Sequence, residues 1–278
     1  MTGWSPITRV FDGTHLRADL VRHGGDRLMV TFDYRRRDRN GFGTTAPSQQ
    51  FAQGGFDQLL IATRDNDWFI NADTRALEAA CRDMRRSYRL ASALGFSMGG
   101  FGAFRYARAL GLDRVVAVSP QVSIAPQVVP FETRYHREAR AFDPALGDMT
   151  TLHDPALAGD ILIDPFNLSD LTHARMIQVL FPRVRLIRLP GGGHPCTRVL
   201  RGARRAGLLQ ALAMDPASGG MPLREAHRAA RRDSATYWQG LHRAAQAKHP
   251  ALAARARQNG AKLAIDHDDG VDDAGDSA

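Results

Sequence analysis

The sequence predicts an α/β protein whose mostly parallel sheet is covered by helices on both faces. Two observations support this fold class. Short, near-continuously apolar runs recur along the chain, as expected for strands that are buried on both faces. Helical patterns fill several of the gaps between them, and strands that alternate with helices favour a parallel sheet. With 278 residues, the chain is long enough to bury a sizeable core.

The predicted elements begin with a hairpin and continue as six strands. ITRVF (7–11) and HLRADLVRH (15–23) are separated by Asp12-Gly13, a pair typical of a tight turn between antiparallel strands. The six apolar runs are RLMVTFD (27–33), QLLIAT (58–63), ASALGF (91–96), RVVAVS (114–119), GDILID (159–164) and RVRLIRLP (183–190). Helices are predicted at 72–88, 98–111 and 169–181.

Two regions depart from this alternation. Residues 120–158 hold five prolines and are too long for a simple connection, so we expect an insertion over the top of the sheet. From about residue 216 the chain is rich in Ala and Arg, with helical spacing and no strand candidate. The expected organisation is a main domain over 1–215, a helical C-terminal extension over 216–264 and a disordered acidic tail over 265–278.

Charge and composition limit the classes of partner. The net charge is +8, and because the residues from Ile265 onward hold six Asp and no Lys or Arg, the rest of the chain carries +14. The arginines are scattered, and no zinc-finger spacing, aromatic RNP pattern or GXXG clamp accompanies them, so a nucleic-acid partner is not predicted. A basic body instead favours an anionic substrate, such as an acidic glycan or an acyl-phosphopantetheine thioester.

The sequence also indicates the compartment. The N-terminus lacks the order of a signal peptide, and no apolar run is long enough to cross a bilayer, so we expect a cytoplasmic location without a membrane partner. Cys81 and Cys196 lie far apart and form no spacing motif, which favours reduced thiols.

The stretch GFSMGGFG (95–102) places a serine between glycines where a strand ends and a helix begins. This is a G-x-S-x-G motif in a strand–turn–helix setting, in which the turn strains the serine and larger side chains at Gly95 and Gly99 would collide with their neighbours. Ser97 Oγ would then project above the sheet as a nucleophile. The N–H of Met98 would lie at a helix N-terminus, where it can stabilise an oxyanion.

With this motif the chain resembles the α/β-hydrolase superfamily over roughly residues 7–213. The resemblance implies the α/β-hydrolase fold and a catalytic triad in the order nucleophile, acid, histidine. His194, in LPGGGHPCT after the strand at 183–190, fits the catalytic histidine. Asp164, at the end of the strand at 159–164, is the predicted acid, with Asp170 and Asp160 as alternatives.

The resemblance also implies a second oxyanion donor just beyond the strand at 27–33. It points to Tyr34, with Arg35 as the alternative, although the sequence departs here from the His-Gly-Gly form of many lipases.

Four further residues are predicted to contact substrate, because of the strand ends and the insertion on which they lie: Asn66, Trp68, Gln121 and Phe131. Phe131 and its neighbours in the insertion would form a partial lid that bounds the acyl pocket opposite His194; the alternative is a packed surface excursion with no substrate contact.

Together these features predict a serine hydrolase that cleaves an ester or thioester of a small-molecule or glycan-linked acyl substrate through an acyl-enzyme. No cofactor is implied: GFGTTA (41–46) lacks the following helix of a dinucleotide site, and no metal-binding or P-loop motif is present. Two alternatives are an acyltransferase acting on a glycan or other alcohol, and a non-catalytic binding or interaction module on the same scaffold.

Overall fold

A single sheet of eight strands forms the centre of the molecule in this computed structural model, which describes residues 7–44, 46–215, 217 and 219–268. The spatial order is β1-β2-β4-β3-β5-β6-β7-β8. β1 and β2 run antiparallel to each other and β2 runs antiparallel to β4, whereas the remaining neighbours are parallel. The strands are β1 (Ile7–Asp12), β2 (Leu16–Val21), β3 (Arg27–Phe32), β4 (Phe56–Thr63), β5 (Leu90–Phe96), β6 (Arg114–Val118), β7 (Ala158–Ile163) and β8 (Val184–Arg188). The predicted mostly parallel sheet is confirmed.

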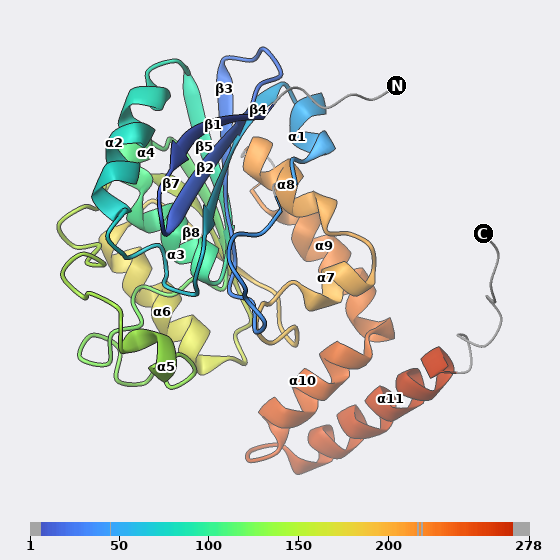
Figure 1. The fold of residues 1–278 in the computed structure, drawn as a ribbon. Helices are drawn as coiled ribbons and strands as arrows, with labels where there is room; N and C mark the ends of the chain where they lie inside the picture. The colour runs from blue at the N-terminus through green and yellow to red at the C-terminus, as the bar shows by residue number, and fades with distance from the viewer. Residues whose placement is uncertain (1–6, 45, 216, 218, 269–278) are drawn as a thin grey trace.

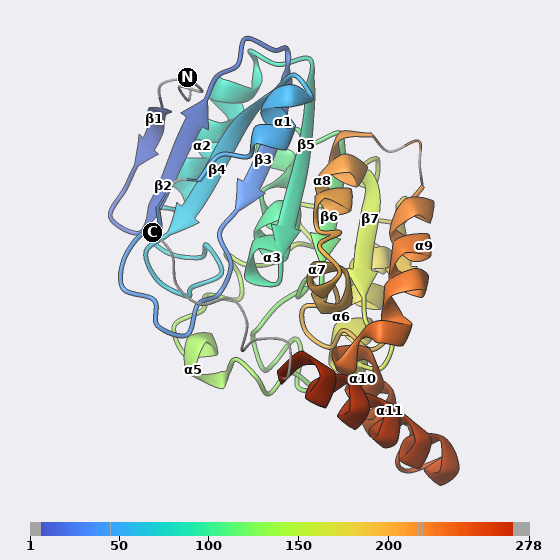
Figure 2. The ribbon, with the colours of Figure 1, turned by 90° about the vertical axis from the view of Figure 1, so that its right-hand side faces the viewer.

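Helices cover both faces of this sheet. In Figures 1 and 2, α2, α3, α4 and α6 lie on one face, and α1, α8 and α9 lie on the other. The helices are α1 (Gln49–Gln53), α2 (Thr74–Arg85), α3 (Met98–Arg105), α4 (Ala107–Leu110), α5 (His136–Ala139), α6 (Leu168–Leu180), α7 (Arg198–Gly202), α8 (Gly207–Met214), α9 (Met221–Ala230), η2 (Arg231–Asp233), α10 (Ala235–Ala245) and α11 (Pro250–Asp268).

The core is divided by the sheet into two apolar clusters. Phe101 and Phe104 of α3 belong to one cluster, and Leu209 and Leu212 of α8 belong to the other. Because both faces are packed, every residue of the central strand β6 is buried. This explains why residues 115–118 are apolar without alternation.

The C-terminal helices differ in how they pack. Leu223 of α9 belongs to the same core cluster as α8, so α9 is part of the main body. α10 and α11 instead pair with each other and project from the body (Figure 1). The expected start of the acidic tail at residue 265 lies inside α11, and its residues 269–278 lie outside the described part of the chain. A domain boundary at residue 215 stays a prediction.

The insertion at 120–158 connects β6 to β7 and contains the short helix α5. The segment lies toward the edge of the sheet at which the parallel strands end (Figure 1). Ligand sites in parallel sheets form at this edge, because loops that follow the strands converge there. Among the described residues, no helix has both the length and the apolar character needed to span a membrane.

Candidate active site

Ser97 occupies a sharp turn between β5 and α3. Its backbone has φ 50° and ψ −115°, in a region that a residue with a side chain rarely adopts. Two hydrogen bonds hold the turn: the N–H of Ser97 donates to the carbonyl of Val118 over 2.8 Å, and the N–H of Phe101 donates to the carbonyl of Ser97 over 3.1 Å. The strained turn expected from the sequence is present.

The flanking glycines are required by close backbone contacts. A Cβ atom on Gly95 would lie 2.2 Å from the carbonyl oxygen of Gly99. A Cβ atom on Gly99 would lie 2.7 Å from the carbonyl oxygen of Asp33, just beyond β3. Both separations are far below van der Waals contact, so the turn can form only when these two residues lack side chains.

His194 lies on the loop between β8 and α7 and connects Ser97 to a carboxylate. Its Nε2 atom is 2.8 Å from Ser97 Oγ, and its Nδ1 atom is 2.8 Å from Asp170 Oδ2. The His194 side chain is 21% exposed, whereas the Asp170 side chain is fully buried. A hydroxyl, an imidazole and a buried carboxylate in this order can move a proton away from the hydroxyl.

The carboxylate beside His194 is therefore Asp170, and the expectation that Asp164 would pair with the imidazole is wrong. Asp164 lies at the end of β7 and accepts hydrogen bonds from the N–H groups of Gly193, over 2.7 Å, and Phe166, over 2.9 Å. Its oxygens point at the loop backbone, so they hold the loop rather than the ring. Burial raises the pKa of Asp164, although these backbone N–H groups oppose the shift.

Asp170 reaches the imidazole because it lies in the first turn of α6. The cap of that helix is Asn167, whose side chain accepts from the N–H of Asp170 over 3.2 Å. The capping role considered for Asp170 thus belongs to Asn167, which leaves the Asp170 carboxylate free to face His194. Asp160, the other alternative, pairs with Arg114 and Arg185 instead.

A buried ionic network continues behind Asp170. Its second oxygen lies 2.8 Å from a guanidinium nitrogen of Arg134, and Arg134 Nε donates to Glu132 over 2.9 Å. Glu132 in turn lies 2.9 Å from His173 Nε2. Burial of Glu132 disfavours its charge, but its bonds to Arg134 and His173 outweigh burial and hold its pKa at about 2. One guanidinium therefore balances two buried carboxylates.

Tyr135 brings the insertion to the reactive groups. Its hydroxyl lies 3.3 Å from His194 Nε2, and its ring packs edge-on against Trp68 with centroids 4.7 Å apart. Burial raises the pKa of Tyr135, so the hydroxyl keeps its proton and can donate a hydrogen bond. The sequence analysis missed Tyr135 and Arg134. The sequence feature that could have indicated them is the group of polar residues Glu-x-Arg-Tyr (132–135), which lies in the insertion predicted over the top of the sheet.

The two predicted oxyanion donors, the N–H groups of Met98 and Tyr34, differ in whether they already donate a hydrogen bond. Met98 is the first residue of α3, so its N–H has no acceptor within the helix. The N–H of Tyr34 donates to Asp33 Oδ1 over 2.9 Å, while the Tyr34 side chain lines the cleft at Ser97. The Tyr34 N–H is thus already engaged.

The four residues predicted to contact substrate do not line the cleft at Ser97. Asn66 holds the loop after β3, since its side chain accepts from the backbone N–H of Arg36 and from Arg39 Nε. Trp68 and Gln121 are fully buried and bond to each other, with the indole N–H donating to the amide oxygen over 3.1 Å. Phe131 packs on the ring of His173 with centroids 4.9 Å apart. In this structure these positions serve packing and loop support, although Asn66 also lines a neighbouring cavity with Arg35 and Arg37. Their contact with substrate stays a prediction.

The cleft beside Ser97 has a volume of about 540 Å³. Its lining combines four arginines with apolar side chains, and none of the described lining residues is Asp or Glu. The lining residues are Tyr34, Arg35, Arg37, Phe96, Ser97, Tyr135, His194, Pro195, Thr197, Arg198, Arg201, Ala206 and Leu209. The insertion contributes Tyr135 to this wall, and Phe131 does not take part, which corrects the lid expected around Phe131.

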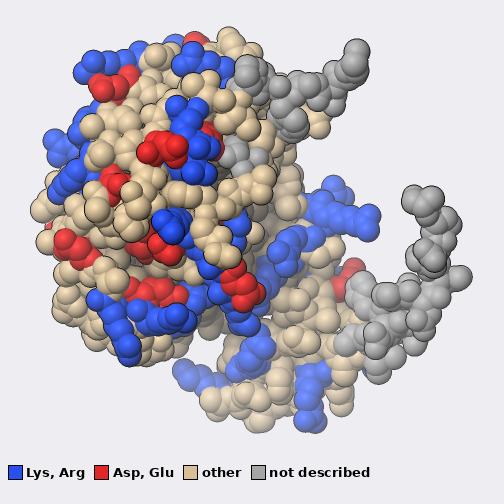
Figure 3. All heavy atoms as spheres, viewed as in Figure 1, with Lys and Arg blue, Asp and Glu red and all other residues tan. Residues whose placement is uncertain are grey.

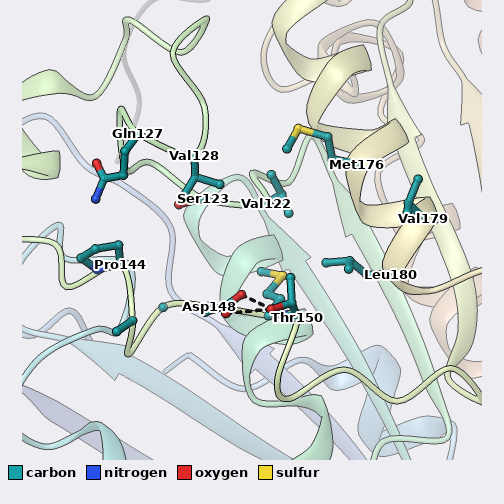
Figure 4. Close-up of a pocket in the computed structure, with 13 residues that line it drawn as sticks. Val122, Ser123, Gln127, Val128, Pro144, Asp148, Thr150, Met176, Val179 and Leu180 are labelled. Atoms are coloured by element: carbon teal, nitrogen blue, oxygen red, sulfur yellow. Dashed lines mark hydrogen bonds between the residues drawn. The ribbon is translucent and has the colours of Figure 1, made fainter.

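The insertion lines a different cavity, of about 580 Å³, against α6. Figure 4 shows Met176, Val179 and Leu180 of α6 facing Val122 and Val128 of the insertion across it. Ser97, His194 and Asp170 do not line this cavity. It is therefore a cavity separate from the cleft at Ser97.

The C-terminal helices support the His194 loop from behind. A Cβ atom on Gly240 of α10 would lie 2.7 Å from the carbonyl oxygen of Gly191, and one on Gly191 would lie 2.6 Å from the Tyr237 ring. The helix and the loop therefore touch through their backbones. α10 therefore packs directly against the loop that carries His194.

The described residues hold no group of three or more His, Cys, Asp or Glu side chains arranged to bind a metal. Both cysteines are free and buried. Burial also raises the pKa of Cys196, two residues beyond His194, which keeps this thiol protonated and unreactive.

Comparison with known proteins identifies the fold. The capsule O-acetyltransferase of Neisseria meningitidis serogroup A is similar with a TM-score of 0.51 and 14% identity, over 76% of this chain and 96% of that one. The 2,6-dihydroxy-pseudo-oxynicotine hydrolase is similar with a TM-score of 0.52 and 15% identity, over 77% and 69% of the two chains. The chain has the α/β-hydrolase fold.

A third solved structure agrees. EstE1, a thermostable carboxylesterase from a metagenomic library, is similar with a TM-score of 0.50 and 12% identity, over 76% of this chain and 89% of that one. No family model matches the sequence, and no curated protein matches it either. At these identities the likeness establishes the fold, and the chemistry has to be inferred from the site itself.

Proposed function

We propose that the protein is a serine hydrolase that cleaves an ester or thioester through Ser97, His194 and Asp170. The observation that carries this proposal is the chain of two 2.8 Å contacts from Ser97 Oγ through the imidazole to the buried Asp170 carboxylate. It lies at the edge of the sheet where the strands end, and it opens into a cleft of about 540 Å³. A merely structural network would not need a strained serine at the floor of a cleft.

The proposed reaction begins with proton transfer. His194 Nε2 takes the proton of Ser97 as the oxygen attacks the carbonyl carbon, while Asp170 accepts a hydrogen bond from the Nδ1–H group and stabilises the imidazolium. The tetrahedral oxyanion accepts a hydrogen bond from the N–H of Met98. The second donor is the N–H of Arg35, because the N–H of Tyr34 already donates to Asp33. His194 then protonates the leaving group, and water cleaves the acyl-enzyme by the reverse sequence.

An acyltransferase is the second candidate. The acyl-enzyme can pass its acyl group to an alcohol in place of water. The volume of the cleft at Ser97, about 540 Å³, favours this second candidate. The partition is measurable: adding an alcohol or glycan acceptor diverts product from the free acid to the new ester if transfer is the reaction. A chain that is only a binding module would form no acyl-enzyme.

Labelling with a fluorophosphonate tests the proposal. The reagent reacts with activated serines, so the native protein should be labelled and should hydrolyse p-nitrophenyl acetate, whereas Ser97→Ala should lose both properties with little change in its melting temperature. Ser87→Ala is the matched control, because Ser87 is an exposed serine in the turn after α2 and does not line the cleft. Labelling that persists in Ser97→Ala would remove Ser97 from the mechanism.

A further inference from the structure

Three arginines on the wall of the Ser97 cleft have no ion-pair or hydrogen-bond partner among the residues that the structure describes. Arg37, Arg198 and Arg201 line the cleft and are exposed, and within the described part of the chain their side chains take part in no ion pair or hydrogen bond. Arg35, the fourth arginine of the lining, is held by Glu138 at 2.7 Å. These three guanidinium groups therefore have no ion-pair partner within the described residues, although Arg37 also lines a neighbouring cavity whose wall includes Asp65, Asp67 and Glu138.

This arrangement is not a simple consequence of an Arg-rich surface. Basic and acidic side chains lie interspersed over the face of the molecule in Figure 3, and many arginines are paired, such as Arg39 with Asp33 and Arg89 with Asp26. The cleft instead gathers arginines while its described lining has no carboxylate. Arg198 and Arg201 are also three residues apart on α7, where like charges repel and weaken a helix. A bound anion would relieve that repulsion.

The chemistry of the lining indicates which anion. A guanidinium group presents parallel N–H donors that match the oxygens of a phosphate, and a doubly charged phosphate can engage several guanidinium groups together. The same cleft has apolar surface from Phe96, Ala206 and Leu209. A molecule that fits both would carry an acyl or alkyl part and a phosphate group.

We propose that the Ser97 cleft takes an ester or thioester whose non-acyl part bears a phosphate, bound by Arg37, Arg198 and Arg201. This inference rests on the proposed hydrolase function for its chemistry, but the phosphate contact is a binding property and can be measured without turnover. A phosphate on the non-acyl part would draw the substrate to the cleft and hold its carbonyl over Ser97.

Two matched pairs of molecules test the inference by calorimetry. Each pair differs only by a phosphate: 4′-phosphopantetheine with pantetheine, and glycerol 3-phosphate with glycerol. The phosphorylated member of at least one pair should bind about tenfold or more tightly, as expected for charge-assisted hydrogen bonds, and should protect Ser97 from fluorophosphonate labelling. The first pair represents a thioester carrier and the second an ester carrier, so the tighter pair identifies the source of the phosphate.

Variants locate the contact. Arg198→Gln and Arg201→Gln should each reduce the preference for the phosphorylated member by about tenfold, since each removes one charge-assisted contact. Arg108→Gln is the matched control, because Arg108 is exposed and unpaired in the described structure but lies on α4, which packs against α2. It should leave the preference unchanged.

Two results would overturn the inference: equal affinity within both pairs, or a preference that persists in Arg198→Gln and Arg201→Gln and therefore arises elsewhere on the basic surface. Failure of the hydrolase proposal looks different. In that case p-nitrophenyl acetate would not be hydrolysed and Ser97 would not be labelled, whereas the calorimetric preference would still report on the phosphate contact.

Discussion

Two regions that meet at His194, the turn at Ser97 and the corner after β7, are held in place by different interactions. The nucleophile turn, residues 95–100, is fixed by backbone contacts that only glycine permits, as the short Gly95 and Gly99 separations show. The corner that follows β7, residues 164–170, is fixed by side-chain charges and carries two carboxylates that both bind the His194 loop. Asp164 binds its backbone and Asp170 binds its ring. A turn set by steric contacts leaves a local motif, whereas a corner set by charges does not.

The sharpest test of the corner compares its two carboxylates. Asp170→Asn should lower kcat by about 10³- to 10⁴-fold, because the amide can no longer stabilise the imidazolium or fix its tautomer. Asp164→Asn should lower it by less than about tenfold, since the amide oxygen can still accept from the Gly193 N–H. Steady-state hydrolysis of p-nitrophenyl acetate measures both. A larger loss in Asp164→Asn would return the acid role to Asp164.

Substitution in the nucleophile turn should lower the stability of the fold as well as the activity. Gly95→Ala should destabilise the protein by about 3 kcal/mol or more, because the new methyl group overlaps the backbone of α3. Gly202→Ala is the control, since a Cβ atom there would meet nothing within 4 Å. Urea unfolding followed by circular dichroism gives both free energies. Equal stability in the two variants would contradict the steric account of the turn.

Glu132, which is connected to Asp170 of the charged corner through Arg134, should make the stability of the protein sensitive to acid, whereas the nucleophile turn should not. Glu132 has a pKa of about 2 in the folded protein against an ordinary value of 4.5, so its stabilising effect is complete above about pH 4.5 and is lost as the pH falls toward 2. Glu132→Gln should therefore lower the unfolding free energy by about 2 kcal/mol near pH 7 and by progressively less in acid. The exposed Glu225→Gln should change little at any pH. A pH-independent loss would mean that charge is not what Glu132 contributes.

The smallest expected effect lies between the two regions, at Tyr135. Tyr135→Phe keeps the ring against Trp68 but removes the hydroxyl 3.3 Å from His194, so kcat should fall by about tenfold while the stability is retained. Comparing kcat with the melting temperature separates the two contributions. If kcat is unchanged, the hydroxyl takes no part in the reaction.

The same difference explains how far the sequence could be interpreted. The strands and Ser97 were predicted because apolar runs and a glycine-flanked turn are local signals, and His194 followed from a glycine-rich loop after a strand. The choice between Asp164 and Asp170 depends on which carboxylate a loop some 24 residues away approaches, and only the folded arrangement decides it. Arg134 and Tyr135 lie in an irregular insertion, where spacing in the sequence says nothing of direction.

The contact between α10 and the His194 loop bears on how this chain can be divided. A boundary at residue 215 looks natural in the sequence, since strands end before it and only helices follow. A protein shortened there would retain Ser97, His194 and Asp170 and would still lose the surface that Gly240 and Tyr237 press against Gly191. In such a fragment the Ser97 turn would be retained, but the His194 loop would lose the contacts that hold it in position. An inactive fragment would therefore not argue against the proposed triad. The chain must therefore extend through α10 (Ala235–Ala245) to keep the contacts that support the His194 loop.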